Sequence, residues 1–200
     1  NPIAGQGTDI SAWLAAAELS YDIDWMRVRS SFMWASGDDD PFDSRATGFD
    51  AIFDIPNFAG GDISYWQRQG IPLIAGGGVA LVNRLSLLPN FRAGKEHGQS
   101  NYVNPGLRLY NLGVDFEILP ELKLITNYSF LQFDETAPLS TVRQDGSFSR
   151  DIGYDLSAGL LYRPWMHNNV QFRLGTAVLL PGDGLEPLYG QETLWDVLSS

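Results

Sequence analysis

The chain has 200 residues, of which 44% are hydrophobic and 18% charged, with no cysteine and a formal net charge of −11. The absence of cysteine excludes disulfides and thiolate metal sites, and the 13 scattered basic residues in an acidic chain argue against nucleic acid as a partner. No uninterrupted apolar run reaches the roughly 18 residues of a membrane helix, so the sequence excludes a helical membrane protein. The start, from Asn1 to Gly5, lacks a basic region followed by an apolar one, so we expect no secretion signal and a mature or internal start.

Six segments alternate apolar and polar residues with a period of two, which predicts β-strands. At about 10–13 residues each, they exceed a typical soluble strand of about 5–6 and approach the ~9–11 that a tilted strand needs to cross a bilayer. We expect one antiparallel sheet in sequence order, joined by hairpins. In chain order the segments are Ser11–Tyr21, Trp25–Ala35, Gly106–Ile118, Leu122–Phe133, Asp151–Arg163 and Val170–Leu180.

The connections between these segments alternate in length, which places all short turns at one rim of the sheet and all long loops at the other. This asymmetry is typical of outer-membrane barrels. The short connections are Asp22–Asp24, Leu119–Glu121 and Pro164–Asn169, and the long ones are Ser36–Pro105, Asp134–Arg150 and the stretch after Pro181.

Aromatic residues gather at both ends of the segments, as the interfacial belts of membrane barrels do. We therefore predict an all-β fold, an antiparallel up-and-down transmembrane β-barrel present as an incomplete barrel of about six or more strands, because about eight is the smallest useful barrel. A soluble β-sandwich is the alternative. Tyr21, Trp25, Tyr162 and Trp165 flank short turns, while Trp34, Tyr110, Tyr128, Phe130 and Tyr154 lie toward the long loops.

The two parities of the strands predict two faces. The polar parity mixes both signs of charge with small residues, which suits a wet lumen. The predicted lumen-facing residues are Glu18, Arg27, Arg29, Asp115, Glu117, Asp155, Arg163 and Arg173. The predicted lipid-facing residues are Val114, Phe116, Leu156, Leu160, Phe172, Leu174 and Val178.

We assign residues 1–200 to part of a single barrel domain, with 36–105 as a long extracellular or lumen-infolded loop region. Unstructured connections of this length are uncommon and usually functional. Its apolar, glycine-rich middle, Ile71–Leu88, is either an additional hairpin or a lumen constriction, and we favour the constriction. The tail from Leu194 begins another strand-like pattern. We expect the remaining strands of the barrel to come from elsewhere.

Few residues suggest other chemistry. Asp38, Asp39, Asp40 and Asp43 are weak candidates for a hard cation such as Ca²⁺, but their spacing is not that of an EF-hand, and a solvated surface loop is the better interpretation. No catalytic constellation stands out, so we expect no enzyme activity and no cofactor.

Several loop and turn phrases resemble the C-terminal half of alginate-export-type outer-membrane β-barrels, a porin-like family of Gram-negative bacteria. The resemblance extends over most of the chain and implies a large barrel with polysaccharide export or small-solute permeation as its role. The phrases are Trp34–Asp38, Gly48–Asp50, Asn104–Leu107, Leu119–Lys123, Tyr162–Pro164 and Leu180–Gly184.

The leading functional hypothesis is a porin-like channel in the bacterial outer membrane, with membrane lipid and a hydrophilic solute or exported polysaccharide as its partners. Two alternatives stay open. One is a structural barrel sheath or anchor for another component, such as an electron carrier. The other is a soluble β-rich binding module, for which the discriminating observation is whether Phe116, Phe172 and Leu174 pack into a core.

Overall fold

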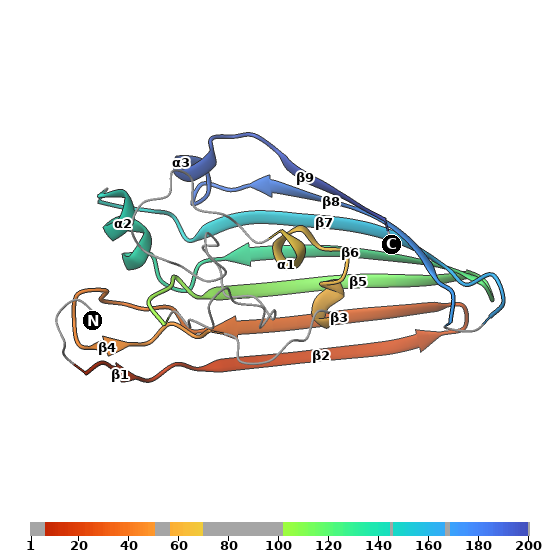
Figure 1. Ribbon diagram of the computed structural model, residues 1–200, viewed down its shortest axis with the longest axis horizontal. Coiled ribbons are helices and arrows are strands. Elements are labelled where there is room, and N and C mark those ends of the chain that lie inside the picture. Colours follow the sequence, from red (N-terminus) through yellow and green to blue (C-terminus); the bar gives the residue numbers. More distant parts are fainter. Residues whose placement is uncertain (1–6, 51–56, 70–101, 145, 167–168, 200) are drawn as a thin grey trace.

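The computed structural model describes residues 7–50, 57–69, 102–144, 146–166 and 169–199. Within them the fold is mostly β, with a seven-stranded antiparallel sheet whose strands are neighbours in the order β2-β3-β5-β6-β7-β8-β9 (Figure 1). The strands are β2 (Leu14–Ile23), β3 (Met26–Ala35), β5 (Leu107–Leu119), β6 (Leu122–Gln132), β7 (Asp151–Tyr162), β8 (Phe172–Pro181) and β9 (Leu194–Ser199).

Short elements accompany the sheet. β1 (Asp9–Ile10) and β4 (Arg45–Ala46) form a separate parallel pair. The helices are η1 (Phe58–Gly60), α1 (Tyr65–Arg68), α2 (Ala137–Arg143) and α3 (Glu186–Tyr189). Figure 1 shows the β1–β4 pair, α2 and α3 at one end of the sheet, whereas η1 and α1 lie over its middle. None of the helices in the described ranges is long and apolar enough to span a membrane.

The prediction of six antiparallel strands in sequence order is confirmed. The largest boundary difference is at the first strand, which begins at Leu14 rather than Ser11 and runs to Ile23. The tail forms a seventh strand, β9, paired with β8. Two-residue turns join β2 to β3 and β5 to β6, and Asp24 in the first turn has φ 53°, a conformation that aspartate tolerates better than most residues. The turns lie at the end of the sheet opposite α2 and α3 (Figure 1).

The two faces of the sheet differ in what covers them. We call the face that η1 and α1 pack against the covered face, because η1 contacts β3, β5 and β6 while α1 contacts β7 and β8. The opposite face is the open face, where large apolar side chains such as Leu112 and Phe172 are exposed. Successive residues of each strand alternate between these two faces.

The hydrophobic core lies on the covered face, toward the end that carries the long loops. Leu107, Leu109 and Leu131 are fully buried there, and they pack with Leu139 of α2 and Leu188 of α3. These strand residues share the parity that alternation assigns to a polar lumen. The covered face therefore has an apolar long-loop half, which packs against α1, α2 and α3, and a polar short-turn half.

Candidate functional site

Polar side chains form a continuous row across five strands of the covered face. Glu18, Ser31, Asn111, Ser129 and Asp155 are directly opposite one another in the strand register. Ser31 Oγ donates a hydrogen bond to Glu18 Oε2 at 2.7 Å, and Asn111 Nδ2 donates to Ser129 Oγ at 2.9 Å. Apart from Glu18, the members of the row are buried. The row borders the apolar core on its short-turn side.

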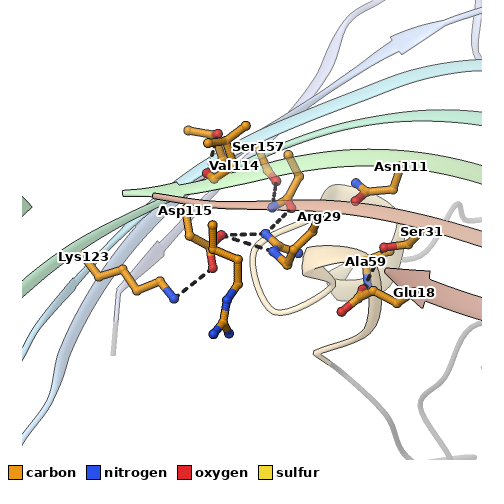
Figure 2. Close-up of polar contacts among 12 residues, drawn as sticks. Glu18, Arg29, Ser31, Ala59, Asn111, Val114, Asp115, Lys123 and Ser157 are labelled. Carbon is orange, nitrogen blue, oxygen red and sulfur yellow. Dashed lines mark hydrogen bonds and ion pairs between the residues drawn. The ribbon is translucent and has the colours of Figure 1, made fainter. Parts of the chain in front are cut away.

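A charged cluster lies one step closer to the short turns and centres on Asp115 (Figure 2). Arg29 Nη2 is 2.7 Å from Asp115 Oδ1, and Lys123 Nζ is 2.8 Å from Asp115 Oδ2. Arg29 Nη2 also donates to Asn127 Oδ1 at 2.9 Å, while Asn127 Nδ2 donates to Ser157 Oγ at 3.2 Å. Arg29 and Asp115 are 8% and 6% exposed. One buried carboxylate thus carries two cations, and buried charges are tolerated only when they are paired in this way.

Residues 57–69, which we call the covering segment, are held by polar contacts against the covered face of the sheet, which we call the wall. The backbone N–H of Ala59 donates to Glu18 Oε2 at 3.1 Å, and that of Trp66 donates to Asp155 Oδ2 at 2.9 Å. Arg173 Nη1 donates to Asp62 Oδ2 at 3.0 Å. The wall therefore supplies carboxylates that accept hydrogen bonds from backbone groups the short helices leave free.

The covering segment also approaches the sheet closely at glycines. Gly60 has φ +68°, and a Cβ atom there would lie 2.2 Å from the Asn127 side chain. Gly159 and Gly175 are opposite each other on β7 and β8. Cβ atoms built on these two glycines would lie 3.0 and 3.1 Å from Ile63 Cγ2. Larger residues at these positions would push the segment away from the wall.

The structure puts seven of the eight predicted lumen-facing residues on the covered-face parity of their strands. Arg163 differs, because it follows the end of β7, where its N–H donates to the Glu121 carbonyl at 2.7 Å. Arg29 and Asp115 come together, whereas Arg27 pairs with Asp22 in an exposed contact. The seven on the covered face are Glu18, Arg27, Arg29, Asp115, Glu117, Asp155 and Arg173.

All seven predicted lipid-facing residues lie on the open face. None of them is buried beneath a second layer of described residues. Leu156, Leu160, Phe172 and Leu174 are exposed, and Val114, Phe116 and Val178 are half-buried among their neighbours on the sheet.

Three aspartates in the loop after β3, Asp38, Asp40 and Asp43, accept hydrogen bonds from groups of the same loop. Buried Asp38 accepts hydrogen bonds from Thr47 N and Oγ1 at 2.9 and 3.1 Å. Desolvation raises the pKa of the Asp38 carboxyl, although the Thr47 hydrogen bonds oppose that shift. Asp40 and Asp43 accept from backbone N–H groups two residues ahead, and Asp39 is exposed. Nowhere in the described ranges do three or more His, Cys, Asp or Glu side chains group as a metal site.

Sequence reasoning missed two parts of this site. The predicted infolded stretch Ile71–Leu88 lies outside the described residues, whereas the covering segment, nearer the start of the same loop region, packs on the sheet. Asn127 and Ser157 were not singled out, although both stand on the polar parity of predicted strands. The adjacent glycines Gly60 and Gly61 were the available signal for a close backbone approach.

Arg29, Asp115 and Asn127 are enclosed and hydrogen-bonded to one another, whereas the more exposed side chains of Arg27 and Arg173 can also hydrogen-bond to water or to a hydrophilic solute. No model of a known family, no curated protein and no solved structure matches the chain. The geometry of the two faces is therefore the basis for a functional assignment.

Proposed function

We propose that the chain forms part of the wall of a bacterial outer-membrane β-barrel, a porin-like channel that passes a hydrophilic solute or an exported polysaccharide. The observation that carries the proposal is the apolar open face. Its exposed side chains extend from one edge of the described sheet to the other, with Leu19 on β2 77% exposed, Leu174 on β8 56% and Val197 on β9 59%.

Such a face is costly in water and favourable in lipid. Apolar surface in contact with water costs about 25 cal/mol for each Å², and soluble monomers rarely expose contiguous apolar patches above a few hundred Å². The hydrocarbon core of a bilayer removes that cost. It also requires every backbone group to be hydrogen-bonded within the protein, as a closed antiparallel barrel provides.

The aromatic residues support the same arrangement, in which the open face is turned toward lipid. Toward the long loops, ring centroids of Phe32 and Tyr110 are 5.3 Å apart, and those of Tyr128 and Tyr154 are 5.6 Å apart. Toward the short turns, Tyr162 and Phe172 are 6.3 Å apart. Tyr154 and Tyr162 stand at opposite ends of β7, roughly 27 Å apart along an ideal strand. For a strand tilted by about 40°, that spacing projects to roughly 21 Å along the membrane normal, slightly less than the ~25 Å apolar band between the aromatic girdles of such barrels.

The alternatives fit the two faces less well. A soluble binding module would bury Phe172 and Leu174, yet each is 56% exposed. A sheath around another component would need free space beside the covered face, and the covering segment, which includes helix α1, occupies part of that space. A channel lined by the more exposed charges of the short-turn half, such as Arg27 and Arg173, agrees with both faces, because charged side chains in a wet lumen form a selectivity field.

Lipid contact is testable with the chain's own tryptophans, of which there are six. Variants that retain only Trp195 or only Trp66 would be folded into vesicles with and without brominated acyl chains. Trp195 is 72% exposed on the open face and Trp66 is fully buried against the covered face. We expect bromine to quench Trp195 strongly and Trp66 little, and equal quenching of the two would contradict the membrane orientation.

Solute passage requires a separate measurement. The full-length protein in planar bilayers should give stepwise ion conductance, and vesicles that contain it should swell in small neutral sugars. A protein that inserts and shows the tryptophan contrast but conducts neither ions nor sugars would leave the barrel assignment standing and refute the channel.

A further inference from the structure

We propose that the covering segment is a fixed constriction, locked to the wall, and that solute passes beside it without displacing it. This inference rests on the proposed channel function and adds which part of the chain sets the width of the passage. The alternative arrangement is a removable plug that must leave the wall before anything passes.

The first support is the distribution of the polar contacts that hold the segment. Glu18 on β2, Asp155 on β7 and Arg173 on β8 each bond to it directly. Arg68 Nε of the segment lies 3.7 Å from Asp196 Oδ2 on β9. Because these strands reach from one edge of the described sheet to the other, movement of a single strand does not release the segment.

The second support is the burial of these contacts. Asp155 is 1% exposed, and the Trp66 N–H donates to it. Lifting the segment would take this donor away from a carboxylate enclosed by the protein, which is unfavourable. Trp66 itself is fully buried and belongs to the same core cluster as Leu109 and Leu179. The segment is therefore anchored through both polar and apolar contacts.

The third support is steric complementarity. Ile63 is 8% exposed and rests on the opposed glycines Gly159 and Gly175, with its methyl groups close to where their Cβ atoms would be. A branched side chain seated over two glycines fixes the position of the segment along the strands. The partly exposed pair of Asp62 and Arg173, with side chains 35% and 45% exposed, then borders the passage beside it.

A disulfide across this contact distinguishes a fixed constriction from a removable plug. The chain has no native cysteine, and a Cβ atom at Gly175 would be 3.6 Å from Ile63 Cβ, within the usual Cβ–Cβ range of disulfides. We expect the full-length Ile63→Cys/Gly175→Cys protein to oxidise readily and to conduct equally well before and after reduction. Loss of conductance on oxidation, restored by a reductant, would overturn the inference.

A labelling measurement gives an answer that does not depend on conduction or on the double variant's folding. In the single variant Ile63→Cys the thiol should react slowly with a bulky, membrane-impermeant maleimide. The matched variant Gln69→Cys, at an exposed position of the same segment, should react rapidly. Equal rates at the two positions overturn the locked segment. A protected Ile63→Cys thiol in a protein without any conductance supports the locked segment and refutes the channel.

Discussion

The two halves of the covered face are built on the same strands and the same residue parity, yet they differ in chemistry. In the long-loop half, Leu109 and Leu131 are fully buried beneath helices. In the short-turn half, Arg29, Asp115 and Lys123 form a charged cluster. The difference shows that strand alternation decides which face a side chain joins, whereas the residue types along that parity decide whether the face forms an apolar core or an enclosed polar cluster.

The two halves also contribute differently to stability. Each fully buried leucine contributes roughly 1.5–3 kcal/mol through removal from water. A buried ion pair gains little net energy after the cost of desolvation, although breaking one by removing a single partner is costly. We infer that the long-loop half stabilises the packing of helices and loops on the sheet, and that the short-turn half is retained for its polar chemistry.

The largest expected effect is in the apolar half. Leu131→Ala should lower the free energy of unfolding by about 2–5 kcal/mol, because it leaves a cavity in a closely packed core. Denaturant titration of the protein in detergent micelles, followed by tryptophan fluorescence, measures the change. Leu112→Ala on the open face, where Leu112 is 53% exposed, is the control and should cost much less. Equal losses would mean that the long-loop half is not a dry core.

An intermediate effect is expected in the charged cluster. Asp115→Asn removes the negative charge that Arg29 and Lys123 share and should cost about 1.5–3 kcal/mol, the usual range for hydrogen bonds to charged groups. Asp22→Asn breaks the exposed pair with Arg27 and should leave the unfolding midpoint unchanged. The same micelle titration compares the two variants. If Asp115→Asn left the free energy of unfolding unchanged, the cluster would be solvated rather than enclosed.

The smallest expected effect is at the border between the wall and the covering segment. Arg173→Gln removes the partly exposed ion pair with Asp62 and should cost about 0–1 kcal/mol. The loss should shrink as salt is added, since salt screens exposed charges. Unfolding titrations at low and high ionic strength test this, and a loss that salt does not alter would mean that Arg173 acts through packing rather than charge.

Much of the sheet was predictable because its strands alternate over long stretches. β8 is the clearest case: Phe172, Leu174 and Val178 share one parity, and the structure places them on the open face. The short turns, too, followed from sequence spacing. The sheet order needed only the rule that strands consecutive in the sequence tend to be neighbours in the sheet.

The apolar long-loop half and the covering segment were not predictable in the same way. Leu107, Leu109 and Leu131 made their strands apolar on both parities near one end, a pattern of burial on both faces, but only the packed helices reveal what covers them. The covering segment has no periodicity of its own. Its position depends on Glu18, Asp155 and Arg173, which are distant from it in the sequence.

Those sequence distances have a consequence for the order of assembly. The hairpins β2–β3 and β5–β6 are closed by two-residue turns, and such elements form within microseconds. The covering segment instead meets Glu18 at a separation of 41 residues, Asp155 at 89 and Arg173 at 111. Its seat over Gly159 and Gly175 does not exist until β7 and β8 have paired. The segment is synthesised before most of the strands that hold it. Its docking is therefore a late folding event, which requires a sheet already assembled through β8.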